Sequence, residues 1–156
     1  MLITNPKIDK IQIYACKFRL AIEQCDKKIL PVYFRDFPRG SCGDASLLLA
    51  KYFKNVGLGD FSYVVGIYNE NHTPYTHAWL KQRNVIVDIT ADQFDDIQQK
   101  VIVTTNSSWH EKFDIQSEST ADLQNYDPFA IGQLLSCYNT IKTYIRHLQE
   151  LETKAQ

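Results

Sequence analysis

Three short pieces of this chain carry the side chains that thiol chemistry needs. In chain order they are Arg39-Gly40-Ser41-Cys42-Gly43-Asp44, Thr76-His77-Ala78-Trp79 and Val87-Asp88-Ile89-Thr90. A thiol attacks an acyl carbon as the thiolate, and an imidazole that takes its proton makes that thiolate available. A carboxylate can in turn orient the imidazole and stabilise its cationic form. We therefore take Cys42, His77 and Asp88 as the candidate catalytic residues.

The surroundings of Cys42 favour a reactive thiol. If Ser41 is the N-cap of a helix, Cys42 is its first residue, where free backbone N–H groups and the helix dipole favour a thiolate. Cys42 also begins the apolar stripe that should face the core. Ser41 and Gly43 are candidates for oxyanion or substrate contacts, and Gly43 leaves room beside the sulfur. Asp44 would raise the thiol pKa, unless Ser41-x-x-Asp44 forms a capping box.

A hairpin places the imidazole beside the carboxylate. We expect strands at residues 75–80 and 85–89, joined by a polar turn at residues 81–84. A symmetric turn pairs Leu80 with Val85 and sets His77 opposite Asp88. Directly opposed residues share one face of the sheet, with Cβ atoms about 5 Å apart. A register slip of one residue would place the two side chains on opposite faces.

Trp79 and Gln93 are further candidates for substrate or oxyanion contacts. Trp79 lies two residues beyond His77 on the same strand, hence on the same face of the sheet. It either walls the site or packs on the sheet. Gln93 either contacts the substrate or completes a Thr90-x-x-Gln93 capping box for a short helix at residues 91–100, and we favour the capping box.

Cys, then His on a strand, then Asp on the next strand resembles the order in papain-like and transglutaminase-like thiol enzymes. The resemblance covers roughly residues 38–94. The short separations between the three residues are similar to the compact transglutaminase-like side of this superfamily, which includes bacterial toxin and effector deamidases. The resemblance implies a Cys-bearing helix packed on an antiparallel sheet that carries His and Asp. Residues 34–37 lack the Gln that serves papain-like proteases as an oxyanion donor, so only the Cys42 backbone N–H is assigned.

This resemblance implies a cysteine-dependent hydrolase or acyl transferase that acts on amide bonds of a protein or peptide through a thioester. Peptidase, glutamine deamidase and transglutaminase-like reactions all remain open. Arylamine acetyl transfer uses the same triad on a related core, but the chain is short for the additional cofactor-binding domain. A non-catalytic binding or immunity module that keeps the fold is the alternative from a different class.

A metal site is a separate alternative. Cys42, His77 and Asp88 together could hold zinc with one open position. No helical HxxxH and no paired Cys supports such a site, so we assign no metal and no cofactor. The absence of a close CxxC pair also argues against a zinc ribbon or a thioredoxin-type motif. The other cysteines lie in apolar helical patterns and should act as small hydrophobes: Cys16, Cys25 and Cys137.

Helices must flank these strands. Asn5-Pro6 reads as the start of a first helix, a second helix begins near Ser41, and Asp127-Pro128 opens a long third one. Further strands are expected at residues 61–68 and 101–105. This order predicts one α+β domain over residues 1–156, with an antiparallel sheet.

Residues 106–125 are polar and read as irregular. Trp109 and Phe113 are expected to anchor this segment by packing. The histidines without a partner pattern are assigned to the surface or to loops: His72, His110 and His147.

The composition narrows the function classes. The chain has 156 residues, of which 44% are hydrophobic and 22% charged, with a formal net charge of −1. A near-neutral balance gives no reason to expect nucleic-acid binding, and no apolar run approaches a membrane span. Residues 1–10 lack a signal-peptide pattern. We expect a cytoplasmic protein, or one exported as an effector by a route that reads no N-terminal signal; the sequence carries no signal for the oligomeric state.

Overall fold

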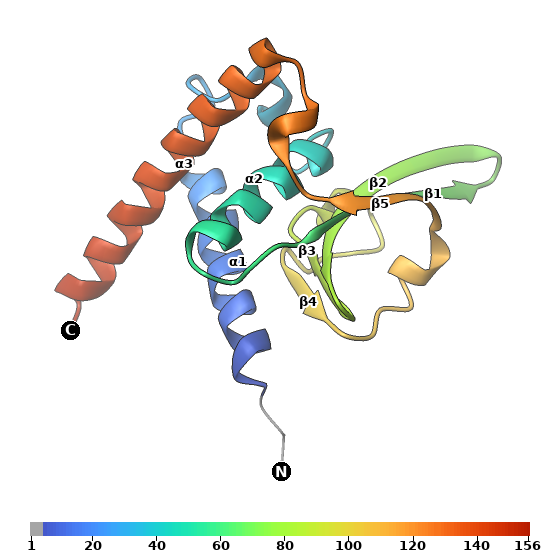
Figure 1. The fold of residues 1–156 in the computed structure, drawn as a ribbon, viewed down its shortest axis with the longest axis horizontal. Helices are drawn as coiled ribbons and strands as arrows, with labels where there is room; N and C mark the ends of the chain where they lie inside the picture. Colours follow the sequence, from blue (N-terminus) through green and yellow to red (C-terminus); the bar gives the residue numbers. More distant parts are fainter. Residues whose placement is uncertain (1–4) are drawn as a thin grey trace.

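The described part of the chain combines three α-helices with a five-stranded antiparallel sheet (Figure 1). A computed structural model describes residues 5–156. The helices are α1 (Pro6–Gln24), α2 (Cys42–Asn55) and α3 (Pro128–Lys154). The strands lie in the order β4-β3-β2-β1-β5, with bounds β1 (Ser62–Glu70), β2 (Thr73–Gln82), β3 (Val85–Asp88), β4 (Ile102–Thr104) and β5 (Asp114–Thr120). The predicted α+β class is therefore confirmed.

The sheet separates a large core from a small one. In Figure 1 the three helices gather on one side of the sheet, and the main core lies between them and the strands. The smaller cluster contains Val64, Trp79 and Phe113, and Phe94 and Trp109 pack against it. Because side chains alternate along a strand, β2 directs Trp79 to the small cluster and the next residue, Leu80, to the main core. The small cluster is the one that surrounds the candidate site.

The helix starts follow from local chemistry. The Asn5 side chain accepts a hydrogen bond from the Lys7 amide, and the Asp127 side chain accepts from two amides of the first turn of α3. Both caps are followed by a proline, which suits the first helical position. Helix α2 begins at Cys42 as expected, but the Ser41 hydroxyl donates to the Pro38 carbonyl at 3.0 Å and does not cap the helix. The capping box that Ser41-x-x-Asp44 offered as an alternative therefore does not form.

The predicted hairpin register is also wrong, by two residues. The strands run up to a two-residue turn, so Leu80 pairs with Val87 and Gln82 with Val85. Arg83 opens this turn in the left-handed region, with φ 55°. Because a shift of two keeps every side chain on its original face, His77 and Asp88 still share a face.

Two segments between the hairpin and α3 differ from expectation. Only a short 3₁₀ turn, Ala91–Gln93, forms where the sequence predicts a helix over residues 91–100. Strand β5 forms within residues 106–125, which were expected to be irregular. All seven residues of β5 are exposed, so its sequence has no alternation of apolar and polar side chains to reveal it.

A buried arginine fixes the loop that follows β3. The Arg19 guanidinium of α1 binds both carboxylate oxygens of Asp92, at 2.6 and 2.7 Å, and donates to the Ile89 carbonyl at 2.6 Å and the Lys100 carbonyl at 3.2 Å. Arg19 is 4% exposed and lies over the Phe37 ring. One side chain thus satisfies backbone groups at both ends of residues 89–100, which explains how this loop is ordered without a helix.

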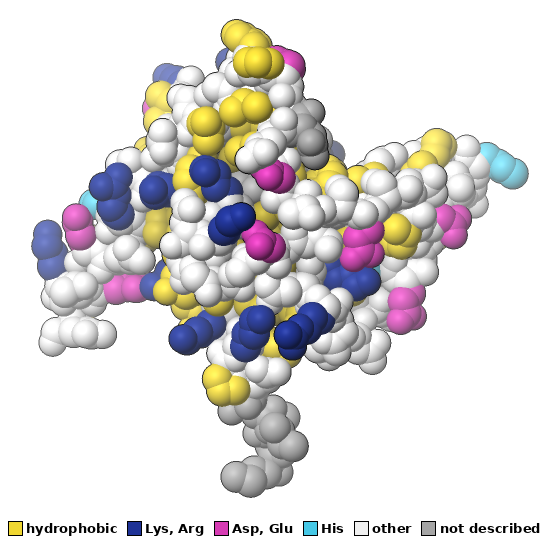
Figure 2. Space-filling model, in the orientation of Figure 1, with side chains coloured by type: hydrophobic (Ala, Val, Ile, Leu, Met, Phe, Trp, Pro, Cys, Tyr) yellow, Lys and Arg dark blue, Asp and Glu magenta, His cyan; other side chains and the backbone are white. Residues whose placement is uncertain are grey.

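The surface bears both charge signs. On the face in Figure 2, Lys and Arg side chains gather mostly over the helical part, while acidic side chains are spread more widely. Within residues 5–156, no helix combines the length and apolarity that crossing a bilayer requires.

Replacing Arg19 by Met should lower the free energy of unfolding by about 3 kcal/mol, because Asp92 and two carbonyl groups lose their buried partner. Urea denaturation followed by circular dichroism measures the change. Arg146→Met is the matched control, since Arg146 is exposed on α3 and its loss should change stability by less than about 0.5 kcal/mol. Equal effects of the two substitutions would contradict the role given to Arg19.

Candidate active site

Cys42 meets the sheet where β2 and β3 stop pairing. The pairing of β2 with β3 extends only from Gln82 to Leu80, so the backbone of Ala78 has no partner on β3. The Ala78 backbone instead lowers the pKa of the Cys42 thiol. One turn into α2, the Ser46 hydroxyl donates to the Ala78 carbonyl at 3.4 Å. The start of α2 is therefore joined to β2 at the residue next to His77.

His77 and Asp88 form a buried pair on the two strands. The distance from His77 Nε2 to Asp88 Oδ2 is 2.6 Å, and the two residues are 0% and 1% exposed. In the observed register, which pairs Leu80 with Val87, His77 and Asp88 are not directly opposite each other. Asp88 is the last residue of β3, and its side chain meets His77 diagonally across the two strands. The predicted contact therefore forms through a different pairing.

The Asp88 carboxylate accepts hydrogen bonds from four donors. His77 and His110 both bond to Oδ2 through Nε2, at 2.6 and 2.9 Å. The amide and hydroxyl of Thr90 donate to Oδ1, at 2.9 and 3.3 Å. An ionised carboxylate can be buried only when its lone pairs are satisfied in this way. This environment holds Asp88 ionised and in one orientation.

Electrostatic coupling then favours a charged pair at Cys42 and His77. Burial alone would lower the pKa of His77, but the Asp88 charge, the Asp88 hydrogen bond and the interaction with Cys42 raise it to about 9. Burial would raise the pKa of Cys42, and the Asp88 charge adds to this, yet hydrogen bonds from His77 and Ala78 and the charge of His77 lower it overall. Burial also opposes ionisation of Asp88, but His77 and His110 hold its pKa well below the usual range. Asp44, which the sequence suggested would raise the thiol pKa, is not among the groups that shift Cys42.

The ring nitrogens of His77 have different partners. Asp88 accepts from Nε2, so Nδ1 is the nitrogen left for the Cys42 proton. The Gln93 side-chain nitrogen lies 3.2 Å from Nδ1 and also donates to the Thr90 carbonyl at 3.1 Å. Gln93 therefore contacts the candidate site, and the interpretation of Gln93 as a cap for a helix at residues 91–100 is wrong.

An aromatic shell encloses the ring of His77. Its centroid lies between 5.2 and 5.9 Å from those of Trp79, Phe94, Trp109 and Phe113. Trp79 thus lies on the same face as His77, and Trp109 and Phe113 anchor their segment, as the sequence predicts. These walls exclude water from the imidazole, which strengthens its interaction with Asp88.

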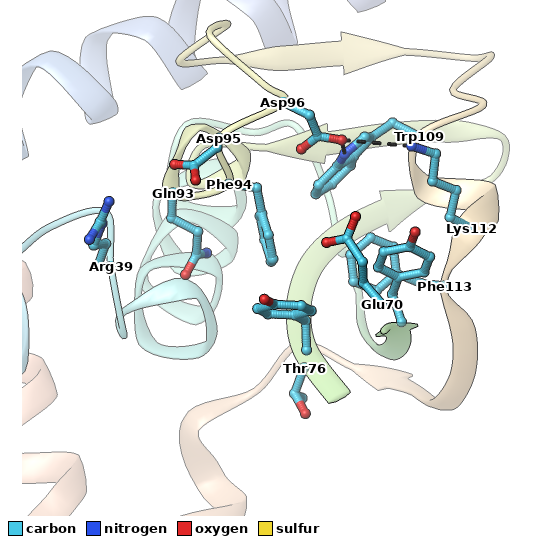
Figure 3. A pocket seen from close by; sticks show the side chains of 12 residues that line it. Arg39, Glu70, Thr76, Gln93, Phe94, Asp95, Asp96, Trp109, Lys112 and Phe113 are labelled. Atoms are coloured by element: carbon cyan, nitrogen blue, oxygen red, sulfur yellow. Dashed lines mark hydrogen bonds and ion pairs between the residues drawn. The ribbon is translucent and has the colours of Figure 1, made fainter. Parts of the chain in front are cut away.

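A cavity of about 680 Å³ adjoins this shell. Phe94, Trp109 and Phe113 line the cavity and also contact His77, and Gln93 and Arg39 lie at one side of it (Figure 3). Asp96 on its wall binds Trp109 Nε1 at 2.9 Å and Lys112 at 3.6 Å. Neither Cys42 nor His77 lines the cavity, which adjoins them through the residues that contact His77 and through Arg39 of the loop that leads into α2.

Ser41 and Gly43 flank Cys42 in different ways. The buried Ser41 hydroxyl is already bonded to Pro38, so its side chain is not presented to a substrate. A Cβ at Gly43 would come within 2.8 Å of the Tyr63 hydroxyl. Gly43 therefore lets α2 begin close against β1, beside Cys42.

His110 is the residue of this site that sequence analysis missed. It was assigned to the surface or a loop, but it is 3% exposed and bonds to Asp88. The other two unassigned histidines, His72 and His147, are exposed as expected. The aromatic segment Trp109 to Phe113 was the available signal, because a histidine between two packing anchors is buried with them.

Among the cysteines, Cys25 and Cys137 are buried as expected, whereas Cys16 is exposed.

His77, Asp88 and His110 also offer three ligand atoms within 4.8 Å of one another. Both nitrogens, however, lie at hydrogen-bond lengths of 2.6 and 2.9 Å from a single Asp88 oxygen. Ligand atoms around a tetrahedral zinc stand about 3.3 Å apart, because each lies about 2.0 Å from the ion. The arrangement fits a shared carboxylate acceptor better than a zinc site.

In comparisons with known proteins, no protein-family model, no curated protein and no solved structure matches the chain.

Iodoacetamide should label Cys42 with a midpoint below pH 8.5, the value for a free thiol, because His77 and Ala78 stabilise the thiolate. A Cys16→Ser background removes the exposed cysteine, and burial raises the pKa of Cys25 to about 11 and that of Cys137 to about 12, so both stay silent. His77→Ala should move the midpoint up, whereas His147→Ala should not. Labelling at pH 6 no faster than that of a free thiol would refute an activated Cys42.

Proposed function

We propose that this protein is a cysteine-dependent enzyme that attacks amide or related acyl carbons of a protein or peptide through a thioester on Cys42. The observation that carries the proposal is a half-buried thiol at a helix start, whose pKa is lowered by an imidazole that a fully buried carboxylate holds. A buried ionised pair costs free energy of folding. The cavity that adjoins its aromatic shell supports a catalytic reason for that cost.

The first half of the reaction forms the thioester. In the charged pair the Cys42 proton already resides on His77 Nδ1, and the thiolate sulfur bonds to the acyl carbon. The carbon–nitrogen bond then breaks, and the departing amine or ammonia takes the proton from His77. Asp88 keeps its charge throughout and stabilises the imidazolium.

The second half returns the free thiol. Water or an amine attacks the thioester carbon while His77 accepts its proton, and the Cys42 sulfur leaves and regains that proton. Attack by water gives a peptidase or glutamine deamidase, and attack by an amine gives a transglutaminase-like transferase.

We assign two donors to the oxyanion of the tetrahedral intermediate. One is the backbone N–H of Cys42, because the first amides of a helix have no partner within it. The other is the side-chain amide of Gln93, which lines the cavity and already lies 3.2 Å from His77 Nδ1. Gln93 thus takes the oxyanion or substrate role that the sequence left as its second interpretation.

The finer fold assignment belongs to the same proposal. A Cys-bearing α2 packs on β2, and β2 and the adjacent β3 supply His77 and Asp88. This is the arrangement expected of a transglutaminase-like core, and it supports that assignment. Helix α1 contributes Arg19, which orders the loop that carries Gln93.

Cys42→Ala, His77→Ala and Asp88→Asn should each reduce turnover at least about 10³-fold. The first removes the nucleophile, the second removes the group that carries the proton, and the third removes the charge that stabilises the imidazolium. Mass spectrometry of candidate proteins incubated with the wild type and with Cys42→Ala identifies the reaction. A gain of about 1 Da means deamidation, cleavage means peptidase activity, and a larger addition means transfer of an amine.

His147→Ala serves as the control, since His147 is exposed on α3, and thermal denaturation checks that each variant folds. Undiminished modification by the Cys42→Ala protein would end the proposal. Absence of any modification by the wild type, across substrates of all three kinds, would favour the non-catalytic binding module.

A further inference from the structure

His110 and His77 use the same oxygen of Asp88. Their Nε2 atoms lie 2.9 and 2.6 Å from Oδ2. A carboxylate only accepts hydrogen bonds, so each imidazole must carry its hydrogen on Nε2. His77 interacts with Cys42, whereas His110 connects Asp88 to Ser107.

Ser107 fixes the tautomer of His110. Its Oγ lies 2.6 Å from His110 Nδ1 and accepts from the His110 backbone amide at 3.2 Å. Because the hydroxyl can donate to Nδ1, the ring hydrogen stays on Nε2 and is presented to Asp88. This short loop thus delivers a donor to the carboxylate.

Packing prevents the ring of His110 from turning away. Its centroid lies 5.0 Å from that of Trp79 and 4.9 Å from that of Trp109. Both tryptophans also lie within 6 Å of the ring of His77, at 5.8 and 5.7 Å between centroids. The two imidazoles therefore share their walls as well as their acceptor.

We propose that His110 is a positioning residue, which with Ser107 holds Asp88 Oδ2 so that His77 presents Nδ1 to Cys42. This inference rests on the proposed function. Asp88 Oδ1 is anchored by Thr90, and His110 anchors the other oxygen. Without His110, the carboxylate can tilt toward Thr90, and the hydrogen bond that orients His77 loses its alignment. A displacement of about 1 Å in such a site can cost about 10²-fold in rate.

The test follows Cys42 directly and needs no substrate. In the Cys16→Ser background, His110→Phe keeps a planar ring and removes the donor, whereas His110→Gln keeps an N–H near the place of Nε2. The midpoint of iodoacetamide labelling should shift toward higher pH in His110→Phe and be largely restored in His110→Gln. On an amide substrate, turnover should fall about 10²-fold in His110→Phe with little change in KM.

Ser107→Ala keeps the inference testable if His110→Phe does not fold. It should move the labelling midpoint in the same direction by a smaller amount, because His110 then loses its tautomer preference. His147→Phe is the matched control and should leave the midpoint unchanged. A wild-type midpoint in His110→Phe, or in Ser107→Ala when the former is unfolded, would overturn the role of His110.

These outcomes separate the inference from the proposed function. If wild-type Cys42 labels like a free thiol, the proposed function fails. If wild-type Cys42 is activated and the His110 and Ser107 variants leave that activation intact, only the inference fails.

Discussion

The structure depends on a single buried carboxylate. Asp88 is 1% exposed and yet accepts four hydrogen bonds, two from histidines and two from Thr90. An unpaired charge at this depth would cost several kcal/mol. The need to satisfy the Asp88 carboxylate therefore constrains three parts of the structure: the end of β3, the Trp109–His110 segment and the ring of His77. Because Nε2 of His77 is held by Asp88, the other ring nitrogen, Nδ1, is the one left for Cys42.

The other half of the arrangement comes from the end of strand pairing. Two strands that stayed paired would leave no room for a helix terminus at their centre. Here β3 stops at Asp88. The Ala78 carbonyl accepts a hydrogen bond from the Ser46 hydroxyl, and the Ala78 backbone lowers the pKa of the Cys42 thiol. Arg19 then holds the chain after β3 in place. The Cys42 thiol thus lies at the level of the sheet, where it interacts with His77.

Local signals predicted much of this architecture, and long-range contacts account for what they missed. The Asn5-Pro6 and Asp127-Pro128 starts are short-range chemistry and were read correctly. The pairing of His77 with Asp88 was predicted through the wrong register, since strand alternation fixes the face but the turn fixes the partner. The helix expected at residues 91–100 is replaced by a loop because Arg19, distant in sequence, binds that segment. The role of His110 depends on its contact with Asp88, which is distant in the sequence. The residues next to His110 give no sign of this contact apart from the aromatic side chains.

The charge state of His77 at neutral pH tests the central claim most directly. The ¹⁵N NMR shifts of its ring nitrogens report this state, and the chain has only 4 histidines, so a His77→Gln sample assigns the signals. The interaction with Asp88 and Cys42, which raises the pKa of His77 to about 9, predicts a doubly protonated ring at pH 7. A neutral His77 ring at pH 7 would contradict the thiolate–imidazolium pair on which the proposed chemistry rests.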